Sequence, residues 1–329
     1  TQLLFSYQIF SDLSPEDGRI TAIIKLMEKY QDFEVALMAK VAADVDETYN
    51  AINSVKPLDM NVYRGAVLKI AAKRGANADF IKDTLMKFGI DVTDADAAAI
   101  AHNMSSVYTA ADQWYSVLMK GTKLTPQMES DGVTPKVDMD GNVLNYVEPI
   151  VIDYIKLNNI GAPVIGPGKP ENVNHMMPFI RHRYTQQSDN NQDYYIEDAF
   201  DIPNALAYFE QAGNEKVAVL GLPEHVFTED YSFAAESNAH ADRTFVTVVQ
   251  QYLFMFGGER YNYGHPDYWR TMYLIFSGRF NKGYVVNEDI FSAYHLGSIG
   301  MTVAYETFTK LGKAREASFA TVFGLFVKF

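Results

Sequence analysis

Apolar residues recur every three or four positions along much of the chain, which is the spacing of one face of an α-helix. Segment 14–30, SPEDGRITAIIKLMEKY, shows the pattern clearly. Ser14 suits the N-cap position and Pro15 suits the first helical position. Similar patterning continues beyond residue 30, so the sequence predicts helix over residues 14–48.

Further helices are predicted where the same spacing meets good start and stop residues. Lys73 and Arg74 precede Gly75, which is typical of a helix C-terminus. Asn77 and Thr93 are suitable N-caps. The predicted segments are 60–75, 77–90, 93–121, 202–213, 242–258, 265–280 and 287–329.

Two stretches interrupt the helical pattern. Residues 131–150 hold two short apolar–polar runs around Asp140-Gly141, which is a hairpin signal. Residues 161–178 contain four prolines and three glycines, as a crossing between lobes would. We therefore predict a mainly α fold with two helical lobes, a small β-hairpin insertion and a Pro/Gly-rich crossing. The predicted domains are 1–160 with the hairpin, the linker 161–178, and 179–329.

Composition narrows the chemistry that the chain can perform. The 329 residues include 21 Tyr and 21 Phe but no Cys. Disulfides, thiolate metal sites and Cys nucleophiles are therefore excluded. The first residues lack the basic region of a signal peptide, and no apolar run reaches about 18 residues, so no membrane span is expected.

The net charge of −13 is unevenly distributed. Residues 186–242 hold 12 acids against the single base Lys216. Outside that segment the chain is nearly neutral and has short basic runs. A basic groove on an acidic protein is therefore possible.

Catalytic signatures are weak. The seven His residues form no metal-binding motif, and Glu236 and His240 are a single pair four residues apart. The Asp138 loop lacks the last carboxylate of a calcium loop. We expect no enzyme, no metal and no cofactor. The alternative is an all-α metal-dependent enzyme built around the acids of 229–242 and His240.

Basic clusters remain as candidate binding residues. Lys69 and Lys73 lie four residues apart on one predicted helix face, beside Arg74. Arg181 and Arg183 precede Tyr184, and aromatic rings beside cations suit single-stranded nucleic acid. The predicted nucleic-acid contacts near the lobe junction are Lys69, Lys73, Arg74, Lys156, Lys169, Arg181 and Arg183.

Two helical lobes with a basic junction resemble the nucleoproteins of negative-strand RNA viruses. The resemblance implies a nucleocapsid or coat protein that clamps single-stranded genomic RNA between its lobes. It also implies a location in the virion, and in host cytoplasm or nucleus during infection. A virion shell protein without RNA contact is the alternative.

Both ends of the chain, TQLLFSYQIF and ATVFGLFVKF, are apolar and aromatic. Apolar ends need a surface to cover them. Docking onto a second copy would produce a homo-oligomer. Packing of both ends into the chain's own core is the alternative.

Overall fold

The fold is taken from a computed structural model. It describes residues 3–7, 32–126, 145–157, 175–186, 192–241, 251–257, 268–273, 294–315 and 317–328, with positions 23, 25–27, 29–30, 134, 188, 243–244 and 248.

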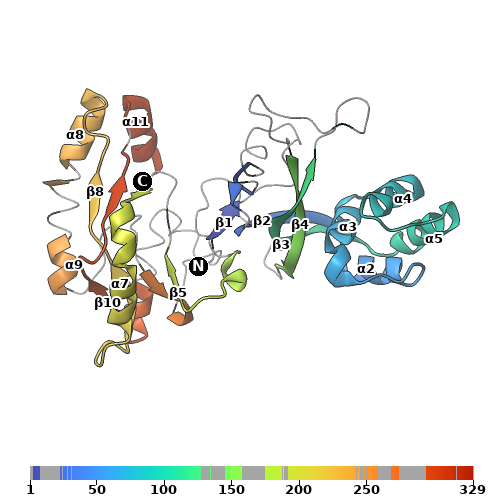
Figure 1. The fold of residues 1–329 in the computed structure, drawn as a ribbon, viewed down its shortest axis with the longest axis horizontal. Coiled ribbons are helices and arrows are strands. Elements are labelled where there is room, and N and C mark those ends of the chain that lie inside the picture. Colours follow the sequence, from blue (N-terminus) through green and yellow to red (C-terminus); the bar gives the residue numbers. More distant parts are fainter. Residues whose placement is uncertain are drawn as a thin grey trace. The chain divides into compact units, whose positions relative to one another are not determined.

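The chain forms two compact units that mix helices and strands. Unit 1 comprises Thr1–Gly166 with Glu171–Phe179, and unit 2 comprises Pro167–Pro170 with Ile180–Phe329. Three sheets occur among the described residues, two with four strands and one with three. The predicted mainly α fold is therefore wrong (Figure 1).

Unit 1 is built on a sheet with the order β1-β2-β3-β4. β1 (Leu3–Tyr7) pairs parallel with β2 (Phe33–Ala43). β3 (Tyr108–Pro126) pairs antiparallel with β2 and with β4 (Asn145–Lys156). The apolar N-terminal segment 3–7 thus lies in the sheet of its own unit, while self-association stays a prediction.

The predicted helix over 14–48 is wrong in its second part, where β2 runs. Most of this strand is buried, including Val35, Ala36, Leu37 and Met38 in succession. A strand covered on both faces reads as a continuous apolar run, so its period does not distinguish it from a helix.

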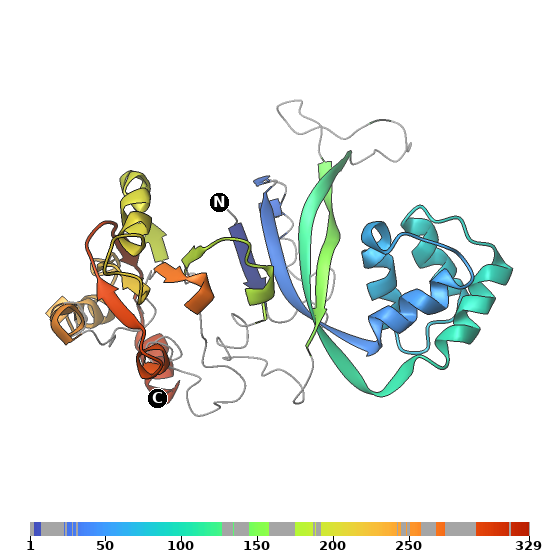
Figure 2. The same cartoon turned by 90° about the horizontal axis from the view of Figure 1, so that it is seen from below.

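Four helices are inserted between β2 and β3 and gather beyond one end of these strands (Figure 2). They are α2 (Val45–Asn53), α3 (Met60–Ala72), α4 (Ala78–Lys87) and α5 (Asp94–Met104). Two predicted N-caps are confirmed. Asn77 accepts from the Phe80 amide, and Thr93 forms a capping box with Asp96.

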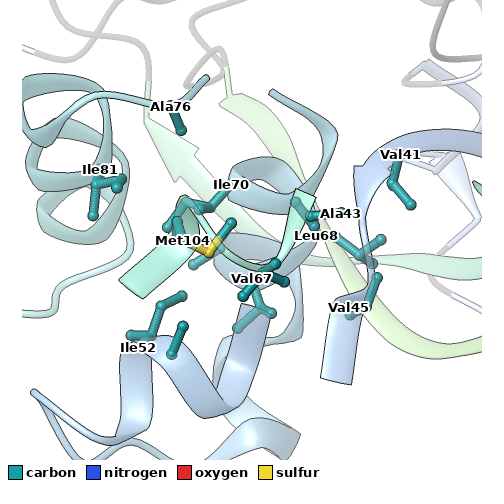
Figure 3. Packing of buried hydrophobic residues seen from close by; sticks show 14 of the residues in the cluster. Val41, Ala43, Val45, Ile52, Val67, Leu68, Ile70, Ala76, Ile81 and Met104 are labelled. Carbon is teal, nitrogen blue, oxygen red and sulfur yellow. The ribbon is translucent and has the colours of Figure 1, made fainter. Parts of the chain in front are cut away.

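The main apolar core of unit 1 lies where these helices meet the sheet. Ile52 of α2, Val67 and Ile70 of α3, and Met104 of α5 converge there (Figure 3). Each of these side chains is fully buried. The insertion is therefore an integral part of unit 1 and shares its core.

The predicted helix 93–121 ends early, because β3 starts at Tyr108. Tyr115 and Val117 face the helical core, while the alternate residues Ser116 and Leu118 are buried on the other face. Both faces are covered, which again hides the strand period. β3 and β4 pair up to Pro126 and Asn145, whereas the predicted Asp140-Gly141 turn lies outside the described residues.

Unit 2 holds the other two sheets. The first has the order β10-β7-β9-β5, with strands Thr302–Tyr305, Val217–Gly221, Tyr268–Arg270 and Tyr184–Gln186. The second has the order β6-β11-β8, with strands Gln192–Tyr194, Leu311–Lys313 and Glu224–Val226. The described helices of this unit include α7 (Ile202–Phe209), α8 (Phe233–Ala241), α9 (Gln251–Gly257) and α11 (Phe319–Lys328). Short 3-10 turns are η1 (Met177–Phe179, in unit 1), η2 (Ile196–Phe200) and η4 (Thr271–Tyr273).

Two predicted helices of this half contain strands in their described residues. Segment 265–280 contains β9, whose residues Tyr268, Trp269 and Arg270 are all buried. Segment 287–329 contains β10 and β11 before α11. Within the described part of the chain, none of the helices has the length and apolar character needed to cross a bilayer.

Gly65 on α3 tests the packing of unit 1. A Cβ at Gly65 would lie 2.9 Å from the Phe88 ring, closer than van der Waals contact allows. Overpacking costs about 1–3 kcal/mol, against a helix-propensity gain of about 1 kcal/mol for Ala over Gly. We expect Gly65→Ala to lower the free energy of unfolding by about 1 kcal/mol in urea denaturation. Gly297→Ala, with no atom within 4 Å of the new methyl, is the control and should not destabilise.

Candidate functional site

The candidate site lies at the carboxyl ends of the parallel strands β7 and β10. β7 is buried along its whole length, and β10 pairs beside it. The Glu306 amide, immediately after β10, donates to the carbonyl of Gly221 at the end of β7 (3.1 Å). In open α/β sheets, ligands bind outside the carboxyl ends of parallel strands. This edge is therefore where a ligand site is expected.

A buried ion cluster follows directly after β7. Glu224 is 5% exposed and its Oε1 accepts from the Arg315 guanidinium at 2.7 Å. Lys313 Nζ lies 4.0 Å from Oε2 of the same carboxylate, and its side chain is 3% exposed. Glu224 and Lys313 come from the neighbouring parallel strands β8 and β11. The cluster thus fixes two segments that are about 90 residues apart in sequence.

Backbone ties extend this junction. Arg315 N donates to Thr228 Oγ1 at 2.8 Å, and Phe227 N donates to the carbonyl of Lys313 at 3.3 Å. Ser232 Oγ donates to the carbonyl of Ala317. The chain entering α8 therefore runs beside the chain entering α11.

Two partly exposed carboxylates, one on the segment that follows β10 and one bonded to it, belong to this edge. Glu306 begins this segment, and Asp198 accepts from the amide of Lys310 at 2.5 Å. Tyr268 is packed against the same region, where burial raises the pKa of its hydroxyl to about 12. The edge thus carries two carboxyl groups that are accessible to water, Asp198 and Glu306, near the neutral hydroxyl of Tyr268.

A second polar pair lies in unit 1. Ser116 Oγ on β3 donates its hydrogen to the backbone carbonyl of His175 at 2.7 Å. Because a hydroxyl has one hydrogen to donate, the same oxygen accepts the second bond, at 2.8 Å, from the Nδ1–H of the His175 ring. Both residues are buried, and burial lowers the pKa of His175 to about 4. Nearby, Phe179 packs with Ala36 and Leu118. The pair fastens segment 175–179 to the sheet and lacks the geometry of an activated Ser nucleophile.

The predicted nucleic-acid residues of unit 1 are spread over two elements. Lys69, on α3, and Lys73, its C-cap, are exposed. Arg74 pairs with Asp112 at 2.9 Å, and Lys156 pairs with Asp44 at 2.5 Å.

Asp44 is the N-cap of α2. Burial alone would raise the pKa of its carboxyl, but hydrogen bonds from Lys156 and from the backbone amides of Glu47 and Asp46 lower it overall. Lys156 is therefore paired with the residue that caps the N-terminus of α2.

The remaining predicted residues belong to unit 2 or lie outside the described part. Arg183 pairs with Glu210 at 3.2 Å and lies over the Tyr184 ring. Arg181 is exposed and lies two residues before Arg183 in the sequence. Lys169 lies outside the described residues. A basic groove built from these residues stays a prediction.

The described acids of the alternative metal site do not cluster, and Asp242 lies outside the described residues. Glu229 pairs with Arg243, while Glu236 and His240 are exposed on α8. Over the described ranges, no group of three His, Asp or Glu residues could hold a metal ion.

Sequence reasoning missed the ion cluster. In the sequence, Lys313 and Arg315 form only a short basic run, and Glu224 is one of the twelve acids of residues 186–242. The one available signal was the position of Glu224, an acid that follows the apolar run 217–222.

Comparison with known proteins shows to which family the chain is related. Residues 148–329 match the family of 1,3-beta-glucan synthase components. Callose synthase 4 of Arabidopsis thaliana is 35% identical over 213 residues, which is 63% of this chain and 11% of that protein. The 1,3-beta-glucan synthase component bgs3 of Schizosaccharomyces pombe is 34% identical over 51% of this chain and 10% of its own length. Component bgs2 of the same yeast is 26% identical over 93% of this chain and 16% of its own length.

These relationships correct the earlier interpretation. The relatives are named plant and yeast synthases, so the resemblance to viral nucleoproteins, the capsid function and the virion location are wrong. The expectation of a non-enzymatic protein is overturned by the same relatives. The chain spans only about a tenth to a sixth of the length of these relatives. Because the family match covers more than half of its residues, the chain belongs to the glucan synthase family of 1,3-beta-glucan synthase components.

Proposed function

We propose that this chain is a segment of an enzyme that joins glucosyl units into a 1,3-β-glucan. The observation that carries the proposal is the family match over residues 148–329. This segment contains both sheets of unit 2 and the carboxyl edge of β7 and β10. The proposed site is this edge, because parallel strand ends are the usual place for a ligand in such sheets.

The chemistry requires an activated glucosyl donor such as a nucleoside diphosphate glucose. The bond between the anomeric carbon and the donor phosphate oxygen breaks, and the leaving diphosphate keeps the electron pair. The 3-hydroxyl of the acceptor sugar forms the new bond and gives its proton to a base. Asp198 and Glu306 are the partly exposed carboxylates that this edge offers for that role.

Direct titration of a nucleoside diphosphate glucose into the full chain, by calorimetry, tests the proposal. We expect saturable binding that free nucleoside diphosphate competes away, since both carry the diphosphate. Replacing Glu306 by Gln should leave donor binding nearly intact while slowing glucosyl transfer to a 1,3-β-glucan oligosaccharide by about a hundredfold, the typical contribution of a general base. Absence of saturable donor binding would contradict the proposal.

A further inference from the structure

Unit 2 carries an unusual group of exposed aromatic side chains. Tyr231, Phe233, Phe319 and Phe323 are each at least 70% exposed, and Phe227 is 49% exposed. Large aromatic rings normally lose water on folding, since burying one stabilises by about 1.5–3 kcal/mol. Contiguous exposed patches of this kind mark binding surfaces. These five residues are called the aromatic patch below.

The backbone ties bring the patch together. Ser232, which donates to the Ala317 carbonyl, directly precedes Phe233 and lies two positions before Ala234 of α8. Phe319 begins α11 two residues after Ala317. The first turns of both helices therefore start next to each other, and Figure 1 shows both helices at the same end of this unit.

Local sequence explains why the rings face outward. The buried face of α8 is made of the small residues Ala234, Ala235 and Ala239, which leaves Phe233 on the solvent side. Phe319 and Phe323 are four residues apart on α11, so they share one helix face. The small buried side chains let α8 pack closely on unit 2 while its aromatic residue stays outside.

The charges beside the patch favour an uncharged ligand. Asp230 and Glu236 are exposed acids next to these rings in sequence. Among the nearby bases, Arg243 is paired with Glu229 and Arg315 with Glu224. Anionic lipid surfaces and nucleic acids require rows of available Lys and Arg, so this charge pattern disfavours both.

We propose that the aromatic patch binds a strand of 1,3-β-glucan, the uncharged polymer of the proposed function, on which this inference rests. Each of the five members presents an aromatic ring that is about half exposed or more. The face of an aromatic ring is electron-rich and attracts the slightly positive C–H bonds on the face of a sugar ring. The Asp230 and Glu236 carboxylates can accept hydrogen bonds from sugar hydroxyls.

Titrating a soluble 1,3-β-glucan oligosaccharide into the full chain by calorimetry tests this site. Phe233→Ala and Phe319→Ala should each weaken binding about tenfold, as expected for loss of one stacked ring. Phe200→Ala is the matched control, because Phe200 is 84% exposed but lies on η2, outside the patch, and its loss should leave affinity unchanged. Equal unfolding midpoints for the three variants show that folding is intact.

Three results would overturn the inference. The wild-type chain could fail to bind the oligosaccharide, or the two patch variants could bind it as well as wild type. The patch variants could also convert a dimer to a monomer in sedimentation velocity with no glucan binding, which would identify a second copy as the occupant. The donor titration separates the two proposals, because donor binding without glucan binding overturns only the patch, whereas glucan binding without donor binding overturns only the proposed synthase site.

Discussion

Glu224→Gln is expected to lower the free energy of unfolding of unit 2 by about 3–5 kcal/mol, the usual effect of removing one partner of a buried ion pair. The amide has nearly the same shape, so packing is preserved while the negative charge beside Arg315 and Lys313 disappears. The two cations then stay in a site with little water and lose this carboxylate, which is costly because charges are poorly stabilised there.

The two tryptophans of the chain allow each unit to be followed separately. Trp269 lies in β9 of unit 2, and Trp114 lies in β3 of unit 1. In a Trp114→Phe background, the fluorescence of Trp269 during urea denaturation measures unit 2. We expect the Glu224→Gln transition at a clearly lower urea concentration.

Glu210→Gln is the matched control, since Glu210 pairs with Arg183 and both side chains are about half exposed. Exposed pairs contribute about 0–1 kcal/mol, so this variant should unfold almost as wild type. An equally small effect at Glu224 would show that the buried cluster does not hold β8 and β11 together.

The second large expected effect is a loss of stability in mild acid that depends on His175. Burial lowers the pKa of His175 to about 4 from 6.5. Between these two pKa values, His175 is therefore protonated in the unfolded chain but neutral in the folded state. The contribution of neutral His175 is fully present above pH 6.5 and is lost as the pH falls toward 4. Between pH 7 and pH 5 the loss amounts to about 2 kcal/mol.

His175→Asn separates this effect from the titration of other groups. The Asn amide can replace the Nδ1–H donor to Ser116 but does not titrate in this range. With Trp114 as the probe in a Trp269→Phe background, we expect the variant to lose about 2 kcal/mol less than wild type between pH 7 and pH 5.

The control for this comparison is His102→Asn. His102 lies exposed in the last turn of α5, so removing it should leave the pH dependence of unit 1 unchanged. Identical pH profiles for His175→Asn and wild type would mean that His175 is solvated and that segment 175–179 is not fastened to the sheet as described.

Several local features were predictable from sequence because their causes are local. The caps Asn77 and Thr93 satisfy amides within three residues of themselves. The glycines Gly75 and Gly89 follow α3 and α4 with positive φ, a conformation that glycine adopts without strain.

The strands were missed for a common physical reason. β9 and the central parts of β2 and β3 are covered on both faces, so these stretches lack the alternation that reveals a half-exposed strand. In β2, Ala and Met are compatible with a helix, and the decision came from pairing with β1 and β3. The partner of a strand can lie far away in the sequence, and the hydrophobic pattern of a segment does not identify which distant segment pairs with it.

The sequence by itself determined the helix caps, the absence of cysteine chemistry and the concentration of acids in residues 186–242. Only the tertiary structure decided that Glu224 meets Arg315 and Lys313 across about 90 residues, and that Ser116 meets His175 across 59 residues. Only the tertiary structure showed that the aromatic rings of α8 and α11 stay exposed. These outcomes depend on sheet order and on which side chains lose water, and both are fixed by contacts between segments far apart in the chain.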